Sequence, residues 1–209
     1  MPLILRPDLA DEQGLVAIGG DLRPQTLVRA YRNGIFPWYN EGDPILWWSP
    51  EPRAIFEMER FYISARLART IRAGKFRLTI NRAFREVMLG CADRDSTWIT
   101  PDMLDAYTRM HELGYAHSIE AWRGDWLVGG VYGVAVGGLF AGESMFHRER
   151  DASKVALAYL VEYLRVRGFV LFDTQVLTEH TASLGALEIP RDEYLTRLKN
   201  ALVVPATFV

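Results

Sequence analysis

Residues 116–146 read AHSIEAWRGDWLVGGVYGVAVGGLFAGESMF, and this stretch decides the fold class. Two short breaks, Gly124-Asp125 and Gly137-Gly138, separate three runs that are rich in β-branched and aromatic residues. Breaks of this kind are typical of the two-residue turns of β-hairpins. The stretch therefore predicts three consecutive strands joined by tight turns.

Helical patterns lie on both sides of these strands in the sequence. PDMLDAYTRMHELG (101–114) repeats apolar residues at helical spacing and stops at a glycine, and residues 153–167 form a second helical pattern. FVLFDTQ (169–175) follows as a further strand, before a last helix. The order predicts an α/β fold with a mixed sheet, and it matches the order of GNAT-type acyltransferases.

The first part of the chain differs in composition, being rich in Gly, Pro and Trp. A helix is expected over Pro24–Arg32, since Pro24 lies in its first turn and Gly34 follows its end. IFPWY and ILWWSP are expected to be short extended pieces around a turn. We expect a small N-terminal domain over residues 1–61 and a catalytic domain over residues 62–209.

The chain has 209 residues, a net charge of −2 and one cysteine, Cys91. A single cysteine excludes an internal disulfide and a cysteine-rich zinc site, and it is typical of a reducing compartment. The first residues do not resemble a signal peptide, and no run of about 18 apolar residues predicts a membrane span. We expect a cytoplasmic protein that acts as a monomer.

Three acidic or amide residues interrupt apolar strands. Asp173 and Gln175 end the strand 169–175 and, by alternation, point the same way. Glu143 interrupts LFAGESMF. A buried carboxylate needs a partner or a function. Spacing alone also allows structural explanations. Asp173 and Gln175 could be a polar strand end that bonds to the next loop, and Glu143 could face solvent.

Seven basic residues and no acid lie between Phe61 and Arg85, so a basic face is possible on a nearly neutral chain. Within this run, Arg66, Arg69 and Arg72 share one face of an expected helix, and Lys75 follows. Such a face either contacts RNA phosphates or is simply solvated. Four tryptophans are candidates for stacking on the bases of a single-stranded RNA end, although each one taken singly is better explained as a core residue: Trp38, Trp47, Trp48 and Trp98.

Signals for metals and cofactors are missing from the sequence. The four histidines show no ligand spacing, and no phosphate-binding P-loop occurs. HRERDASK, before the helix at 153–167, lacks the glycine-rich loop with which acetyltransferases bind the pyrophosphate of coenzyme A. We therefore expect no metal and no cofactor.

Several long strings resemble the leucyl/phenylalanyl-tRNA–protein transferase family, and the match extends from about Gly14 to Leu198. The resemblance implies a GNAT-like catalytic domain that moves Leu, or less well Phe or Met, from aminoacyl-tRNA to acceptor proteins with an N-terminal Lys or Arg. It also implies that the product is marked for N-degron degradation. The strings include GLVAIGGDL (14–22), YRNGIFPWY (31–39), GESMF (142–146) and DTQVLTEHTASLGALEIPRDEY (173–194).

Site residues follow from the resemblance, motif by motif. The catalytic residues would be Asp173, Gln175 and Glu143. Contacts to the aminoacyl-adenosine would come from Tyr31, Trp38 and Trp98. The chain departs from the family where Phe172 stands in place of a frequent Ile, and this leaves the preference between Leu and Phe open. The pocket for the Leu side chain would be formed by Val131, Phe140, Leu157, Leu160 and Phe172.

Because the aminoacyl ester is already activated, positioning of amine and ester would supply most of the rate. Gln175 would accept a hydrogen bond from the amine, Asp173 would orient it, and Glu143 would attract a cationic acceptor. Two alternatives remain at this point. One is an N-acyltransferase that uses coenzyme A, and the other is an RNA-binding module without catalysis.

Overall fold

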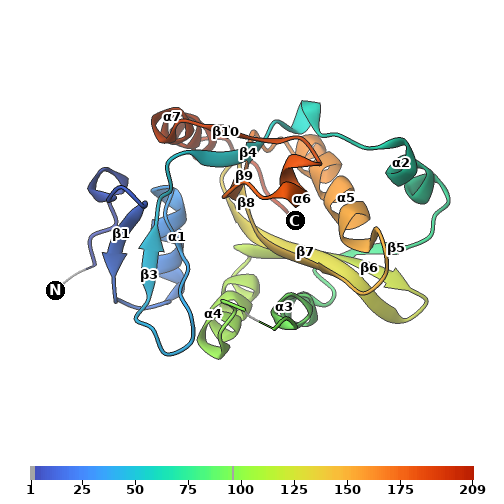
Figure 1. Ribbon diagram of the computed structural model, residues 1–209, viewed down its shortest axis with the longest axis horizontal. Helices are drawn as coiled ribbons and strands as arrows, with labels where there is room; N and C mark the ends of the chain where they lie inside the picture. Colours follow the sequence, from blue (N-terminus) through green and yellow to red (C-terminus); the bar gives the residue numbers. More distant parts are fainter. Residues whose placement is uncertain (1–2, 96) are drawn as a thin grey trace.

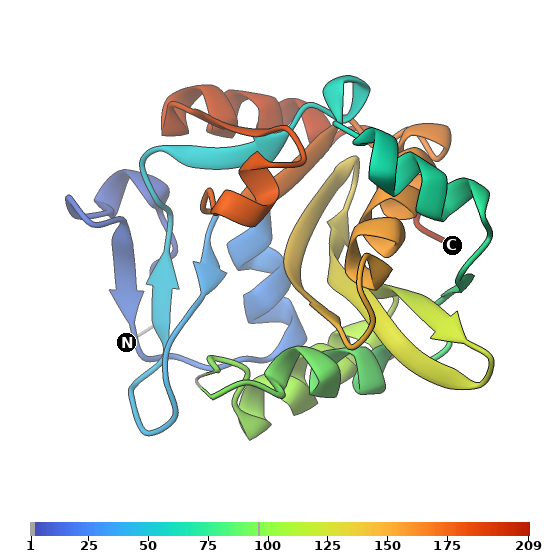
Figure 2. The same ribbon diagram turned by 45° about the vertical axis from the view of Figure 1, so that its right-hand side comes forward.

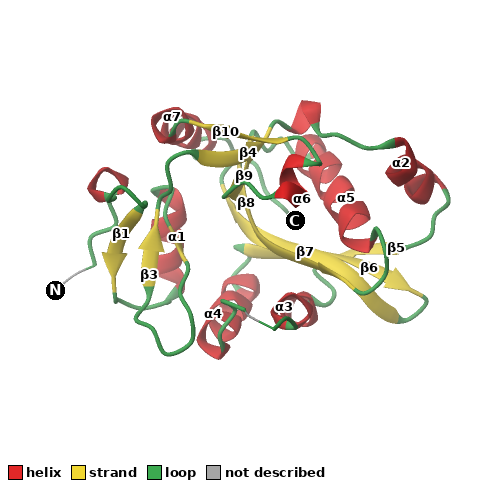
Figure 3. Cartoon of the chain, in the orientation of Figure 1, coloured by secondary structure: helices red, strands yellow, loops and turns green. Residues whose placement is uncertain are grey.

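A seven-stranded mixed sheet forms the centre of the computed structural model, which describes residues 3–95 and 97–209 (Figures 1 and 3). The strand order is β10-β4-β9-β8-β7-β6-β5, and only the pair β8–β9 is parallel among the pairings of the described residues. The predicted α/β class with a mixed sheet is confirmed. The strands are β4 (Arg53–Phe56), β5 (Arg77–Ile80), β6 (Ala116–Arg123), β7 (Trp126–Val136), β8 (Leu139–His147), β9 (Leu171–Gln175) and β10 (Ala186–Ile189).

Helices cover both faces of this sheet (Figure 2). The helix α5 (Ala152–Val166) packs on one face, and α3 (Phe84–Ala92) and α4 (Pro101–Glu112) pack on the other. Thr100 caps α4 by accepting a hydrogen bond from the Met103 N–H at 3.3 Å. Each face of the sheet has its own apolar core, one beneath α3 and α4 and the other beneath α5.

The N-terminal part forms a second, three-stranded sheet of order β1-β3-β2. Its helix α1 (Pro24–Arg32) contacts α4 and β7, so its buried side chains join the core on the α3–α4 face. The remaining elements are β1 (Leu15–Ile18), β2 (Phe36–Pro37), β3 (Leu46–Trp48), α2 (Ala65–Arg72), α6 (Glu179–Ala182), α7 (Arg191–Ala201) and the short 3-10 helices Pro7–Leu9 and Met58–Arg60.

Strand β4 connects the two parts of the chain. The expected boundary at residue 61 assigns residues 53–56 to the N-terminal domain, yet β4 lies between β9 and β10 in the large sheet and all four of its residues are buried. A four-residue strand with no alternation carries no signal of its partners, which explains why the sequence did not predict this pairing. The division into two domains itself stays a prediction.

Candidate active site

A cavity of about 500 Å³ lies where β8 and β9 stop pairing. The parallel ladder ends at Ala141 and Asp173, and beyond it β8 continues alone on this side. Residues from the unpaired ends of both strands line the cavity, together with the start of α5. The single parallel pair of the sheet therefore opens a hollow between its carboxyl-terminal ends.

Apolar side chains form one part of the cavity wall: Phe56, Val131, Leu157 and Phe172. Three of the five residues predicted for the Leu pocket are therefore on the wall. Phe140 and Leu160 are not, and both lie in the core behind it. The Phe140 ring packs edge-on against the Phe172 ring, with 5.4 Å between the centroids, and so supports the wall from behind.

A β-bulge places Glu143 at this cavity. Tyr132 pairs with Ser144 and the next residue of β7, Gly133, pairs with Gly142, so Glu143 is the extra residue on β8. The bulge interrupts the alternation of the strand. Of the two readings of Glu143, solvated or paired, the structure shows the paired one.

Two donors hold one oxygen of the Glu143 carboxylate. The Tyr31 hydroxyl and the Gln175 side-chain amide each donate to Oε1 at 2.8 Å. The other oxygen, Oε2, is inaccessible to solvent and has no hydrogen-bond partner among the described residues. Burial raises the pKa of Glu143 to about 8, against the opposing effect of the Tyr31 hydrogen bond. The site thus holds a carboxyl group with one unused oxygen and a pKa near neutrality.

Asp173 lies deeper and is fully paired. Arg53 binds it with two parallel hydrogen bonds, Nε to Oδ1 at 2.9 Å and Nη2 to Oδ2 at 2.6 Å, and both side chains are 1% exposed. The Tyr194 hydroxyl donates to Oδ2 at 2.8 Å. The Arg53 guanidinium lies over the rings of Phe36 and Tyr194. Asp173 does not line the cavity.

Gln175 connects Asp173 with Glu143. Its backbone has a φ of 66°, in the left-handed region, so the strand turns at this residue. The Gln175 N–H donates to Asp173 Oδ1 at 2.8 Å, while its side chain bonds to Glu143. No described residue donates a hydrogen bond to Gln175 Oε1, and Gln175 is not among the residues that line the cavity. Two hydrogen bonds of Gln175 therefore link Asp173 to Glu143.

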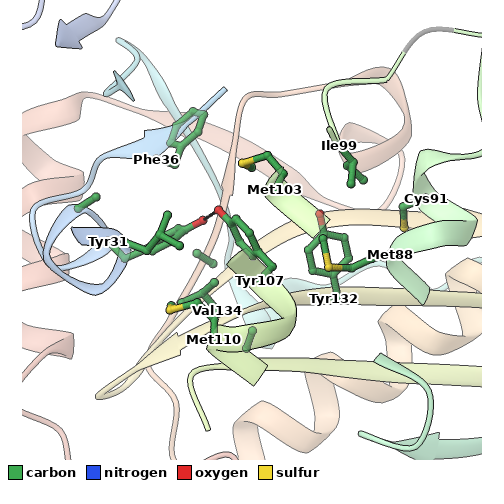
Figure 4. Packing of buried hydrophobic residues seen from close by; sticks show 14 of the residues in the cluster. Tyr31, Phe36, Met88, Cys91, Ile99, Met103, Tyr107, Met110, Tyr132 and Val134 are labelled. Carbon is green, nitrogen blue, oxygen red and sulfur yellow. Dashed lines mark hydrogen bonds between the residues drawn. The ribbon is translucent and has the colours of Figure 1, made fainter. Parts of the chain in front are cut away.

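The three residues predicted to contact the aminoacyl-adenosine lie in different surroundings. Tyr31 is buried, and its hydroxyl forms a hydrogen bond with the hydroxyl of Tyr107 (Figure 4). The same hydroxyl donates to Glu143 Oε1. Trp38 is 47% exposed, with its ring near that of Trp48. Trp98 is half-buried against the core. None of the three lines the cavity.

Sequence reasoning did not find Arg53, Tyr107 or Tyr194 as members of the site. Tyr107 follows the helical period of α4 and is indistinguishable from a core residue by spacing. Arg53 and Tyr194 stand 120 and 21 residues from Asp173 along the chain, with no shared motif. Only the order of the strands brings them to the carboxylate.

The predicted basic face lies on α2. Arg66, Arg69 and Arg72 are exposed. Arg66 is 3.5 Å from Asp151, and Lys75 Nζ is 2.9 Å from a Glu149 carboxylate oxygen. Both acids precede α5, so α2 lies close to the start of that helix.

Residues 55–199 match the family model described as leucyl/phenylalanyl-tRNA protein transferase, and residues 20–51 match the model of its N-terminal domain. The chain belongs to this family. A leucyl/phenylalanyl-tRNA–protein transferase from Anaeromyxobacter sp. (strain Fw109-5) is 57% identical over 95% of this chain and 87% of the relative. Another, from Enterobacter sp. (strain 638), is 57% identical over 92% of this chain and 83% of the relative. As a member, the protein is an enzyme that transfers aminoacyl residues from tRNA to protein.

Similarity of this transferase to solved structures is lower. A GCN5-related N-acetyltransferase-like protein from Streptococcus suis 89/1591 has a TM-score of 0.39 and 13% identity, over 79% of this chain and 63% of that one. L-PGS from Bacillus licheniformis has a TM-score of 0.41 and 14% identity, over 71% and 51%. At this level neither structure adds to the assignment. Of the helices in residues 3–95 and 97–209, none has the length and apolar character needed to cross a membrane.

Proposed function

We propose that the cavity binds the side chain of the aminoacyl group, Leu in preference to Phe or Met, and that the ester carbonyl lies next to Gln175 and Glu143. The observation that carries this proposal is the unpartnered Oε2 atom of Glu143 beside an apolar wall. An apolar hollow suits a hydrocarbon side chain, and an unused carboxylate oxygen suits an amine. An apolar pocket separates side chains that differ by one methylene by only about 1–3 kcal/mol, so some use of Phe and Met is expected.

The reaction joins the acceptor's α-amino nitrogen to the ester carbonyl carbon, and the bond to the ribose oxygen breaks. Gln175 Oε1 accepts a hydrogen bond from the attacking amine. Glu143 Oε2 takes the proton that the amine loses, and the departing ribose oxygen then receives it. The pKa of Glu143, about 8, is close to the reference pKa of an α-amine, roughly 7.7–8.0, so the proton passes between groups of similar basicity.

Asp173 acts as a positioning residue in this proposal. It holds the N–H of Gln175, and its remaining hydrogen-bonding capacity is used by Arg53 and Tyr194. Gln175 is thereby kept in a left-handed conformation with its amide turned toward Glu143. The role predicted for Asp173, orientation of Gln175, fits these contacts.

The acceptor in this proposal is a protein with an N-terminal Lys or Arg, and its product is marked for N-degron degradation. The carboxylate of Glu143 favours a cationic first residue. The exposed face Arg66, Arg69 and Arg72, with Lys75, contacts tRNA phosphates, and Trp38 and Trp98 stack on the terminal adenosine. Support comes from the exposure of these arginines and of Trp38.

Transfer of labelled Leu from Leu-tRNA to peptides tests the proposed function. Peptides beginning with Arg or Lys should become labelled, and the same peptides beginning with Ala should not. Absence of label on every peptide, or equal label on all of them, would contradict the proposal.

A further inference from the structure

The N-terminus of α5 lies at the rim of the cavity with unused hydrogen-bond donors. Asp151 precedes the helix, but its carboxylate turns toward Thr70 and Arg66 of α2 and makes no capping hydrogen bond. No hydrogen bond from the N–H of Ser153 or Lys154 exists among the described residues. Free N–H groups and the helix dipole make such an end a binding site for anions.

Side chains at the same place also lack partners. The Ser153 side chain lines the cavity, is 3% exposed, and has no hydrogen bond to any described residue. Thr174 Oγ1 and His180 Nε2 belong to the same lining and are buried polar atoms without a partner in the part of the chain that the structure describes. Because buried polar atoms are normally hydrogen-bonded, these two atoms beside the Ser153 side chain indicate a polar ligand.

Positive charge gathers around these groups. Lys154 and His147 approach His180 closely enough to lower its pKa, in addition to the larger effect of burial. His147 and Arg148 also line the cavity. The acids on the wall are Glu143 and Asp93, and the Asp93 carboxylate lies 3.9 Å from the Arg148 guanidinium. Asp151 and Glu149, which precede α5, pair with Arg66 and Lys75, so Lys154 and the start of α5 still favour an anionic ligand.

We propose that Ser153, Lys154, His147 and His180 bind the 5′-phosphodiester of the terminal nucleotide of aminoacyl-tRNA. This inference rests on the proposed function, which places the aminoacyl side chain at Leu157. Leu157 follows Ser153 by one helical turn, about 6 Å along the axis of α5. The aminoacyl ester and the 5′-phosphate are substituents of one ribose, so a side chain at Leu157 brings the phosphate toward Ser153.

The position of α2 agrees with an RNA strand that runs from Leu157 toward the start of α5. Asp151 contacts Arg66 and Thr70, so the basic face of α2 begins next to the proposed phosphate site. The preceding phosphates of the RNA strand would then pass from the start of α5 to the exposed Arg69 and Arg72. One strand of RNA accounts for both groups of cations.

Two analogues test the proposal: 3′-leucylamido-3′-deoxyadenosine with and without a 5′-phosphate, measured by calorimetry at low salt. The phosphate should lower Kd about tenfold in the wild type, as expected for charge-assisted hydrogen bonds at a helix N-terminus. The double variant Ser153→Ala/Lys154→Ala should keep the affinity for the phosphate-free analogue and lose most of the gain. Lys199→Ala, on the exposed end of α7, is the matched control and should keep the full gain.

Each other outcome overturns the proposal. Equal Kd values for the two analogues in the wild type would refute the phosphate site and leave the proposed function standing. A full phosphate gain in the folded double variant would refute the role of these residues. Failure of both analogues to bind would contradict the proposed function and the phosphate site together.

Discussion

Two polar clusters meet at the end of β9, and they differ in how many of their hydrogen-bonding groups are used. The closed cluster consists of Arg53, Asp173 and Tyr194, and each carboxylate oxygen of Asp173 accepts two hydrogen bonds. The open cluster consists of Glu143, Gln175 and Tyr31, where Glu143 Oε2 has no partner among the described residues.

Asp173 and Gln175 are two positions apart on β9, yet Asp173 belongs to the closed cluster and Gln175 to the open one. A buried charge without a partner is costly, and Arg53 removes this cost for Asp173. The second oxygen of Glu143 is buried without a partner among the described residues, and burial raises the pKa of this carboxyl group. Closed polar clusters therefore stabilise the fold here, and the open one is suited to chemistry.

The largest expected effect is on the closed cluster. Arg53→Ala leaves the buried Asp173 carboxylate without its cation, so the free energy of unfolding should fall by about 3–5 kcal/mol. Denaturant unfolding followed by circular dichroism measures this change. Arg165→Ala, which removes an exposed ion pair with Glu162, is the control and should cost less than about 1 kcal/mol. If Arg53→Ala lowered the free energy of unfolding by less than about 1 kcal/mol, the closed cluster would not stabilise the fold as proposed.

The next effect concerns the open cluster. Gln175→Asn keeps a residue that tolerates the left-handed conformation, but its amide is one methylene too short to keep its place beside Glu143. Transfer should slow by about 100-fold in kcat, as for loss of one positioned hydrogen-bonding group, while the unfolding free energy changes by less than about 1 kcal/mol. Single-turnover transfer and denaturant unfolding of the same preparation measure both. A large loss of stability with unchanged kcat would assign Gln175 to the closed cluster.

A third prediction concerns pH. The Glu143 carboxyl has a pKa of about 8 in the folded protein and about 4.5 in the unfolded chain. Between pH 4.5 and pH 8 the folded protein therefore binds more protons than the unfolded chain. Stability contributed by this group therefore falls as pH rises from about 4.5 to about 8. Glu143→Gln should remove this fall in stability, which amounts to about 1–3 kcal/mol because the effective dielectric constant is high even at buried sites in proteins. Unfolding at pH 5 and pH 8 measures it, and parallel pH profiles for variant and wild type would show that Glu143 is not perturbed.

The smallest expected effect concerns the apolar wall. Phe172→Ile shortens a side chain on the cavity wall, so the ratio of kcat/KM for Phe-tRNA to that for Leu-tRNA should rise about five- to tenfold, or about 1 kcal/mol. The ratio is independent of the folded fraction of enzyme. Leu160→Val, behind the wall, is the control and should leave the ratio unchanged. An unchanged ratio in Phe172→Ile would place the aminoacyl side chain elsewhere.

Much of the local structure could be predicted because its causes are local. The helix at Pro24–Arg32 has the predicted bounds, and the strands β6, β7 and β8 begin where the turn residues indicated. Trp38 and Trp98 do not line the cavity, and their spacing in the sequence could not have indicated this. β4 and β10 were not predicted, because short buried strands lack a distinctive period.

The sequence by itself determined the mixed sheet, most helix and strand bounds, and the family to which the chain belongs. These depend on capping residues, periodicity and turn residues within a few positions of one another. Only the tertiary structure decided which polar groups are satisfied. Arg53 meets Asp173 across 120 residues and Tyr31 meets Glu143 across 112, and a one-residue bulge re-aims Glu143. Strand order and register set these contacts, and neither is a property of a local segment.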